Sequence, residues 1–273
     1  MGQPSRHPRV SVSGLCFPRL SAVDGVAAVA GLGVVNTSMT STKLRESGTE
    51  AVAAAAAGHG VKVVATTALA RFDLRPGADN EANRGLAVAD IDCAAAVGAA
   101  VAYTLTGPRA RPDWADDVDA YARAAGGLVE YAAERGIVLC VEPTNWLFAD
   151  LNFVHGFHDA IAFARATGLR ICLDLFHAWS EGGLRAEIAA NIDLVAHVQL
   201  SDMQRGARAL PARAVPGDGD VPLAPIVRWL LDAGYAGYFD LELDGPSITA
   251  AGHRQAADRA AGWLSELLAG LGA

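Results

Sequence analysis

The sequence predicts a single (β/α)8 barrel, and three observations support this fold class. Short apolar segments of strand-like composition alternate with segments of helical periodicity along the whole chain. Eight such pairs follow one another, which is the number that closes a parallel sheet into a barrel. The chain has 273 residues, and barrels of this kind typically need about 250 residues. We therefore expect one barrel domain over residues 9–273, preceded by a flexible N-terminal segment of residues 1–8.

The first half of the chain supplies four of the pairs. In the first pair, Val10, Val12 and Leu15 alternate with serines as in a strand, and helical spacing follows. The strand and helix expected in each pair are residues 9–17 and 23–31, 33–38 and 49–58, 61–69 and 83–97, and 100–106 and 115–135. A doubly wound open sheet is the alternative fold. It would need a GxGxxG turn after its first strand, and Gly14 opens no such spacing.

The second half supplies the other four pairs. They are expected at residues 137–142 and 157–167, 169–174 and 183–190, 194–199 and 223–233, and 238–242 and 250–268. Gly136, Gly168 and Gly234 stand between a helix and the next strand, as is common where a chain leaves a helix. The loops at 71–81 and 201–221 follow strands three and seven, so we expect both on the face that carries barrel active sites.

Composition excludes several classes of function. The formal net charge is −8, and Lys43 and Lys62 are the only lysines, so no broad basic surface is expected to bind nucleic acid. The alanine-rich apolar segments are all too short to cross a membrane. The cysteines form no CxxC pair and lie mostly inside apolar segments, which predicts reduced thiols and a cytoplasmic protein.

Polar side chains end the four strands of the second half. In chain order they are Glu142, Asp174, Gln199 and Glu242. Two residues earlier, and therefore on the same strand faces, stand Cys140, Cys172, His197 and Asp240. The residues between them are apolar and suit packing against the outer helices, so the polar set is expected to point into the mouth of the barrel. The predicted site thus lies at the C-terminal ends of strands five to eight.

The four strand ends together predict a metal site. A single strand-end carboxylate is more often a helix cap or half of an ion pair. Four inward donors would bury uncompensated charge unless a cation or substrate balanced it, at a cost of several kcal/mol. Three carboxylates and one amide oxygen match the ligands that hard divalent cations prefer. We expect one divalent metal, Mn²⁺ first, with Mg²⁺ or another divalent ion as alternatives.

Five segments of the second half resemble one known family. They are residues 141–143 (VEP), 174–177 (DLFH), 197–202 (HVQLSD), 213–219 (RAVPGDG) and 241–242 (LE). The family is the xylose isomerase-like TIM barrels, the sugar phosphate isomerase and epimerase group that includes hydroxypyruvate isomerase, ketose 3-epimerases and inosose dehydratase. The resemblance implies a (β/α)8 fold and the metal ligands Glu142, Asp174, Gln199 and Glu242. Gln199 stands where the epimerases usually have histidine.

The resemblance also implies substrate-binding residues beside the metal. His177 and Arg213 correspond to residues that contact substrate in the family, and His197 is a further candidate. Arg205 and Arg208 lie in the same long loop as Arg213, so which arginine reaches the site stays open. Barrels of this group are often dimers or tetramers, so a homodimer or homotetramer is expected.

The activity that the resemblance implies is proton transfer on a sugar or small hydroxy-carbonyl compound. One of Glu142 and Glu242 would remove a proton beside a metal-polarised carbonyl, giving a cis-enediolate, and the other would return a proton. Return at the neighbouring carbon is isomerisation, and return to the opposite face of the same carbon is epimerisation. Loss of a hydroxyl would make the protein a dehydratase or other lyase on a keto-sugar or keto-inositol. A non-catalytic binding module is the third alternative.

Overall fold

Parallel strands close into a barrel in the computed structural model, which describes residues 5–68 and 70–273. Within these residues the order around the barrel is β1-β10-β7-β6-β5-β4-β3-β2. The strands are β1 Val10–Ser13, β2 Asn36–Thr40, β3 Lys62–Thr67, β4 Val101–Thr104, β5 Val138–Val141, β6 Arg170–Asp174, β7 Val195–Leu200 and β10 Phe239–Leu241. The predicted barrel is confirmed. The end of the strand expected at 61–69, Leu69, lies outside the described residues, as do residues 1–4 of the segment expected to be flexible.

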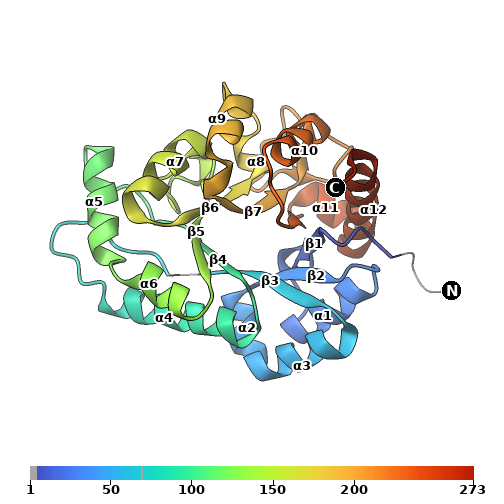
Figure 1. Cartoon of the computed structure of the whole chain (residues 1–273), viewed down its shortest axis with the longest axis horizontal. Coiled ribbons are helices and arrows are strands. Elements are labelled where there is room, and N and C mark those ends of the chain that lie inside the picture. The colour runs from blue at the N-terminus through green and yellow to red at the C-terminus, as the bar shows by residue number, and fades with distance from the viewer. Residues whose placement is uncertain (1–4, 69) are drawn as a thin grey trace.

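Helices surround this barrel (Figure 1). Their bounds are α1 Ala22–Ala30, α2 Ser41–Ser47, α3 Thr49–His59, α4 Glu81–Ala96, α5 Trp114–Ala124, α6 Leu128–Glu134, α7 Gly156–Thr167, α8 Leu175–Ala178, α9 Leu184–Asn191, α10 Leu223–Asp232, α11 Pro246–Ala251 and α12 His253–Leu271. None of the helices in the described part of the chain combines the length and the apolar character that a membrane crossing requires.

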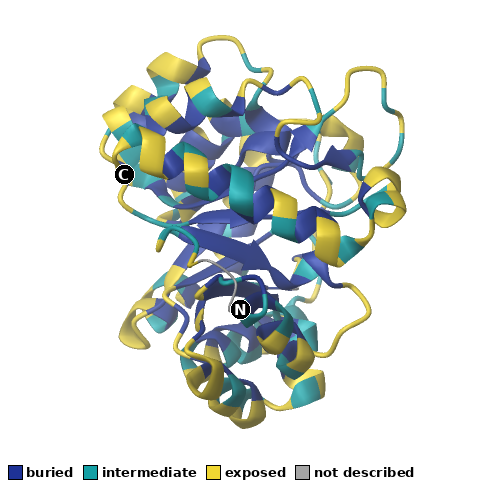
Figure 2. Ribbon diagram, turned by 90° about the vertical axis from the view of Figure 1, so that its right-hand side faces the viewer, coloured by how far each residue is buried: buried dark blue, intermediate teal, exposed yellow. Residues whose placement is uncertain are grey.

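Two separate clusters of buried side chains show which way each strand faces. The inside of the barrel holds a small cluster of Ala65, Val101, Tyr103, Cys140 and Cys172. The large cluster between strands and helices includes the alternate residues Val141, Leu173, Val198 and Leu241. The predicted alternation is therefore confirmed, and it directs the polar strand-end residues to the inside. Figure 2 shows the strands buried and the outward surfaces of the helices exposed.

Strand register places the polar ends at the same end of the barrel, with Asp174 and Gln199 level and Glu142 and Glu242 staggered relative to them. Asp174 pairs with Gln199 across β6 and β7, and Gln199 pairs with Asp240 across β7 and β10. The ladder continues one residue past two strands, because Glu142 N donates to Thr104 O and Glu242 N donates to Leu200 O. The backbone that carries the four donors is thus held by the barrel itself.

Several details differ from the sequence prediction. The strand expected at 9–17 ends at Ser13, and the helix expected at 250–268 begins in α11 and continues in α12 after Gly252, which has φ 82°. The helix expected at 115–135 is two helices, α5 and α6, because Gly126 and Gly127 interrupt it and Gly127 has φ 79°, a conformation that favours glycine. The loop at 201–221 is not wholly irregular, since it contains the antiparallel pair of β8 Asp202–Met203 and β9 Arg213–Ala214. This pair directs Arg213 back over the barrel.

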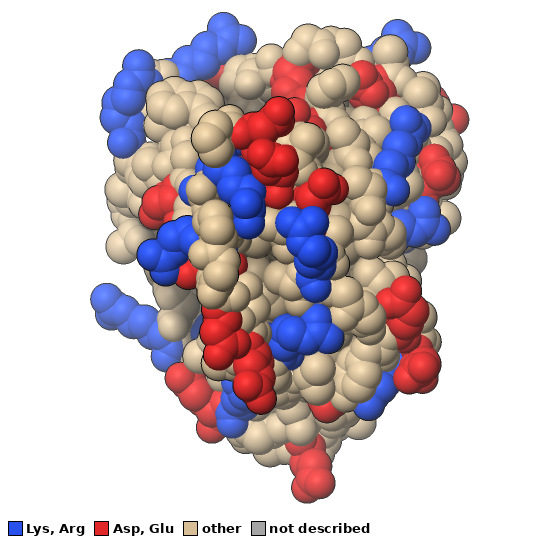
Figure 3. Space-filling model, turned by 90° about the vertical axis from the view of Figure 1, so that its left-hand side faces the viewer, with Lys and Arg blue, Asp and Glu red and all other residues tan. Residues whose placement is uncertain are grey.

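The N-terminal segment lies along α12 where the structure describes it. The Arg6 guanidinium contacts the Asp258 carboxylate at 2.7 Å, and His7 N donates to Ser265 Oγ at 2.8 Å. Figure 3 shows one face of the molecule, that of α5, where Lys and Arg alternate with Asp and Glu and no extended patch of one sign is visible. This face has no surface suited to a polyanion.

Candidate active site

A cavity of about 190 Å³ opens where the strands of the second half end. Four of the residues singled out from the sequence line it: Glu142, His177, Arg213 and Glu242. Tyr103 from β4 and Arg71 from the loop after β3 line it too. A cavity of this size accommodates a small molecule rather than a polymer.

Glu142 lies directly after β5 and is 7% exposed. Asn152 fixes the backbone here by donating from Nδ2 to Glu142 O at 2.9 Å. No described residue donates a hydrogen bond to the Glu142 carboxylate. Burial, together with the nearby Glu242 and Asp174 carboxylates, raises its pKa well above the ordinary value. Glu142 is therefore a buried acid whose oxygen atoms face the cavity without a protein partner.

Asp174 ends β6 and is fully buried. Its Oδ1 accepts from Phe176 N at 2.9 Å, which caps the short helix α8, and its Oδ2 accepts from Arg213 Nη2 at 2.6 Å. Burial alone would raise the pKa of Asp174, but the attraction of Arg213 and His177 lowers it below the ordinary value. Asp174 is thus the ionised carboxylate of the site.

Glu242 lies after β10, on the other side of Arg213. Its Oε1 accepts from Arg213 Nη2 at 2.7 Å, and its Oε2 accepts from Gln199 Nε2. Burial raises its pKa to about 7, and the favourable contact with Arg213 limits the increase. A carboxyl group with a pKa near neutrality can both release and accept a proton at physiological pH.

Gln199 takes part in the site through its amide nitrogen. Its Nε2 donates to Tyr103 OH at 3.0 Å as well as to Glu242, and its Oε1 accepts from Cys172 Sγ at 3.0 Å. In this orientation the amide oxygen faces Cys172. The assignment of Gln199 as a metal ligand stays a prediction, and it requires the amide to rotate so that its oxygen replaces its nitrogen.

Arg213 is the arginine of the long loop that reaches the site. It is buried, its Nη1 donates to Ser201 Oγ at 3.1 Å, and its guanidinium lies 4.4 Å from the centre of the Phe176 ring. Burial alone would lower the pKa of Arg213, but its contacts with the Asp174 and Glu242 carboxylates raise this pKa above the ordinary value for arginine. Arg205 and Arg208 do not line the cavity. Of the three arginines, Arg213 is the one that lines the cavity, and its role in binding substrate stays a prediction.

A buried aspartate that sequence reasoning missed holds this loop in place. Asp202 Oδ2 accepts from Gly217 N and Gly219 N at 2.9 and 3.1 Å, and Oδ1 accepts from Val221 N at 3.0 Å. A Cβ atom on Gly219 would come within about 2.3 Å of Asp202 Oδ1, so only glycine fits. The signal was present in the sequence as an aspartate after strand seven followed by the glycine-rich PGDGD segment.

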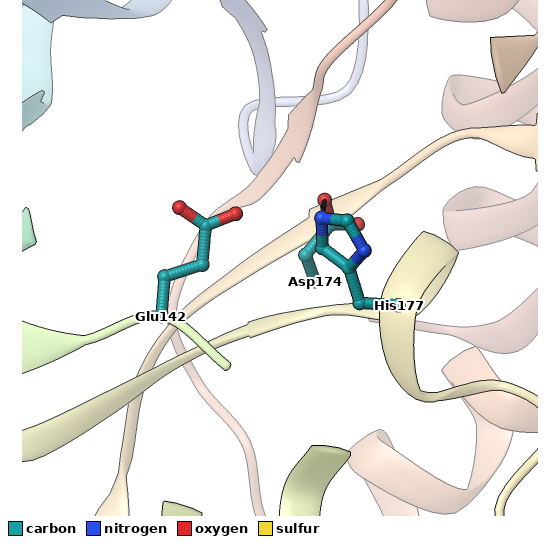
Figure 4. Close-up of side chains that lie close together, drawn as sticks. All are labelled: Glu142, Asp174 and His177. Atoms are coloured by element: carbon teal, nitrogen blue, oxygen red, sulfur yellow. Dashed lines mark ion pairs between the residues drawn. The ribbon is translucent and has the colours of Figure 1, made fainter. Parts of the chain in front are cut away.

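His177 lies on α8 with its ring beside Asp174. Its Nδ1 accepts from Asn145 N at 3.2 Å, and its Nε2 lies 3.8 Å from Asp174 Oδ2. Burial lowers the pKa of His177 to about 4, so the ring is neutral at physiological pH. Figure 4 shows Glu142, Asp174 and His177 directed towards a common space.

His197, by contrast, does not line the cavity. It is 1% exposed and lies one layer deeper in the barrel, with its ring stacked on Tyr103 at 6.1 Å between centroids. Its Nε2 lies 3.6 Å from Asp240 Oδ2 and has no hydrogen-bond partner among the described residues. The assignment of His197 to substrate binding stays a prediction, and direct contact would require movement of the cavity floor.

The donor atoms present fit a divalent cation. Glu142, Asp174 and His177 each offer one ligand atom, and these atoms lie within 4.8 Å of one another. The Glu142 carboxylate is the observation that favours a cation, because it faces the cavity without a hydrogen-bond partner among the described residues and lies near the carboxylates of Glu242 and Asp174. The predicted set of Glu142, Asp174, Gln199 and Glu242 stays a prediction. The structure adds His177 to the candidate ligands.

Comparison with known proteins agrees with this architecture. The family model described as xylose isomerase-like TIM barrel matches residues 24–267. No curated protein matches the chain. Similar solved structures include D-allulose 3-epimerase from Methylomonas sp., with 17% identity, a TM-score of 0.78, and coverage of 98% of this chain and 100% of the other. At such identity the likeness shows the fold.

Two further structures have the same fold. The D-psicose 3-epimerase from Clostridium cellulolyticum H10, solved with D-tagatose, is 15% identical with a TM-score of 0.79, covering 96% of this chain and 99% of its own. The probable 3-DHS dehydratase from Bacillus anthracis is 13% identical with a TM-score of 0.76, covering 94% of this chain and 98% of its own. The fold thus supports both epimerisation and dehydration in other proteins.

Proposed function

The chain belongs to the xylose isomerase-like TIM barrel family, and we propose that it is a divalent-metal-dependent isomerase or epimerase of a sugar or small hydroxy-carbonyl compound. The observation that carries the proposal is the pair of glutamates from non-adjacent strands, Glu142 and Glu242, lining one small cavity with raised pKa values. Proton removal from carbon and its return need two such groups that exchange a proton near neutral pH.

The two glutamates divide the proton transfers according to their surroundings. Glu242, with a pKa of about 7, is ionised in a large fraction of molecules at neutral pH and is the better base. In metal-free protein Glu142, whose pKa is raised by burial and by the Glu242 and Asp174 carboxylates, favours the protonated form and is the candidate acid. The first transfer gives an enediolate, and the second delivers a proton to the neighbouring carbon or to the opposite face of the same carbon.

Two further side chains would hold the reacting oxygens. Because His177 Nδ1 accepts a hydrogen bond from Asn145 N, the neutral ring carries its proton on Nε2. If the metal is held by Glu142, Asp174, Gln199 and Glu242, this Nε2 can donate to a substrate oxygen. Arg213 lines the cavity and supplies a permanent positive charge beside the position where an enediolate oxygen would develop. Both residues act by binding and orienting substrate.

The metal is proposed to be Mn²⁺, with Mg²⁺ or another divalent ion as alternatives. Glu142 and Asp174 would hold it, together with Glu242 and Gln199 or with His177. When bound, it would polarise the substrate carbonyl and so acidify the neighbouring C–H. The assembly as a homodimer or homotetramer and the cytoplasmic location stay predictions.

A dehydratase or other lyase is the second candidate. The strongly raised pKa of Glu142 favours it, because a protonated carboxyl group can deliver its proton to a departing hydroxyl as well as to carbon. The structural likeness to the probable dehydratase is compatible with this candidate.

Incubation in D₂O tests the proposal and separates the candidates. We would incubate Mn²⁺-loaded protein with ketoses, aldoses, inososes and hydroxypyruvate and follow each by NMR and mass spectrometry. Solvent deuterium at one carbon of one compound is the expected result. An accompanying loss of water would identify the lyase. If no compound exchanges or is consumed with any of Mn²⁺, Mg²⁺, Co²⁺ or Zn²⁺, the enzymatic proposal is wrong and the binding-module alternative gains support.

A further inference from the structure

Arg71 stands at the mouth of the cavity between two residues that contact the end of β4 and the segment after it. Its neighbours Ala70 and Phe72 are both buried, at 4% exposure each, whereas Arg71 itself is exposed. Thr104 Oγ1 at the end of β4 donates to Ala70 O at 3.0 Å. Gly107 packs so closely on this segment that a Cβ atom there would lie about 2.9 Å from Phe72 O. The backbone is thus fixed from both sides while the guanidinium is free to reorient.

Arg71 is also unpaired, unlike its neighbours. It makes no hydrogen bond or ion pair to any residue within 5–68 and 70–273. On the same side of the barrel, Arg75 is paired with Asp73, and Arg84 donates to the Ala124 and Gly126 carbonyls. The Arg71 side chain lines both the cavity and an adjoining open cleft of about 460 Å³, so it can turn towards a molecule in either.

The carboxylates that line the cavity do not form an ion pair with Arg71 among the described residues. The second cavity-lining arginine, Arg213, is already bound to Asp174 and Glu242. With a divalent cation present, the three carboxylates Glu142, Asp174 and Glu242 would be balanced by the cation and Arg213. Arg71 and Asp244 are then the remaining charged side chains that line the cavity, and no ion pair joins them among the described residues. An arginine kept free at this point is suited to pair with a negative group on the substrate.

We propose that the substrate of this site carries a carboxylate, which Arg71 binds at the cavity mouth. This inference rests on the proposed function, since it places the hydroxy-carbonyl end of the substrate between Glu142 and Glu242. A carboxylate is favoured over a phosphate because Arg71 is a single charge and Asp244, which also lines the cavity, would repel a dianion. The substrate class is therefore a small hydroxy-keto acid of uronate type.

Three ligands that differ at one carbon test this proposal by binding alone. D-fructose, D-fructuronate and D-fructose 6-phosphate share a hydroxy-ketone end and carry at the sixth carbon a hydroxyl, a carboxylate and a phosphate. Calorimetry with Mn²⁺-loaded protein should show D-fructuronate binding about ten-fold tighter than D-fructose, as expected for one charge-assisted pair. Arg71→Ala should remove this preference and Arg71→Lys should retain part of it.

Arg75→Ala is the matched control, since Arg75 is an exposed arginine of the same loop that does not line the cavity. It should leave the preference unchanged. Equal binding of the three ligands to wild type, or an undiminished preference in Arg71→Ala, would overturn the inference while leaving the proposed function intact. Tightest binding of D-fructose 6-phosphate would overturn the carboxylate assignment. No binding of any of the three would reject the hydroxy-ketone class and this inference with it.

Discussion

The two halves of the barrel end their strands differently at the same rim. In the first half the last residues of β1 to β4 are Ser13, Thr40, Thr67 and Thr104. In the second half Asp174 is the last residue of β6, Glu142 and Glu242 stand one residue after the ends of β5 and β10, and Gln199 stands one residue before the end of β7. The hydroxyl groups of Ser13, Thr40 and Thr104 bond to nearby backbone, and Thr67 lines the cavity as an uncharged side chain, whereas the second set gathers charge around the cavity. Position in the fold alone does not make a strand end functional.

Thr40 and Asp174 make the comparison sharp. Each is the last residue of its strand and caps the helix that follows, since Thr40 Oγ1 accepts from Lys43 N and Asp174 Oδ1 accepts from Phe176 N. Only Asp174 uses its second oxygen for another purpose, which is the contact with Arg213. One local capping interaction therefore serves stability in one half and, in the other, orients a carboxylate towards the site.

The largest effect is expected from Asp174→Asn. The amide keeps an oxygen that can cap α8 but loses the negative charge. Mn²⁺ affinity should therefore fall by at least about 100-fold, which exceeds the effect of removing a residue that only hydrogen-bonds to a metal ligand. Metal titration by calorimetry measures this, and circular dichroism should show an unchanged fold. Asp244→Asn is the control, as a cavity-lining carboxylate outside the proposed ligands. Wild-type affinity in Asp174→Asn would remove Asp174 from the metal site.

Arg213→Ala should show that the carboxylates of Asp174 and Glu242 need the positive charge of Arg213 when no metal is bound. Removing one partner from a buried ion pair costs about 3–5 kcal/mol, so metal-free protein should be strongly destabilised. Added Mn²⁺ should restore much of this loss and bind more tightly than to wild type, because Arg213 no longer competes for Asp174 and Glu242. Thermal unfolding with and without the ion measures both effects. Equal destabilisation in both conditions would argue against this view of Arg213.

Stability of the metal-free protein should fall as pH rises from 5 to 8. Folding raises the pKa of Glu242 from 4.5 to about 7, so its contribution is fully present below about pH 4.5 and lost as pH rises through 7. The loss is on the order of 3 kcal/mol. Bound Mn²⁺ favours the ionised form and should suppress the decline. Unfolding midpoints of Glu242→Gln that fall as steeply as those of wild type would assign the effect to another group.

Thr40→Ala should give the smallest effect and mark the contrast between the halves. Loss of the cap on α2 is expected to lower the free energy of unfolding by about 1 kcal/mol. Denaturant unfolding measures this change, while metal affinity should stay at the wild-type value. A clear loss of metal binding would mean that strand ends of the first half also support the site.

The fold and the ends of the second-half strands could be predicted from local pattern. Apolar alternation sets which side chains face inward, and a polar residue at the end of an apolar run is visible in the sequence, as at Glu142 and Asp174. Predicting the barrel requires no knowledge of contacts between distant residues, because it rests on the eight-fold repeat of the strand–helix unit. The barrel and the inward direction of these strand-end residues can therefore be predicted from the sequence.

Contacts between distant residues could not be predicted in the same way. The Arg213 contact with Asp174 spans 39 residues and depends on the β8–β9 pair, which the sequence shows only as an irregular loop. The orientation of the Gln199 amide is set by Tyr103, 96 residues earlier. Arg71 carries no motif at all, and its place at the cavity mouth follows from Thr104 at the end of the next strand and from Gly107 in the segment after it.

The most direct test of the central claim is deuterium exchange by Glu142→Gln and Glu242→Gln. Both changes keep an oxygen and the size of the side chain but remove the acid or base. With the compound that wild type exchanges in D₂O, each variant should be slower by about 100-fold or more, on the scale of general acid–base catalysis, while Asp244→Asn stays near the wild-type rate. If both glutamine variants exchange substrate protons as fast as wild type, the two-glutamate account of this barrel is contradicted.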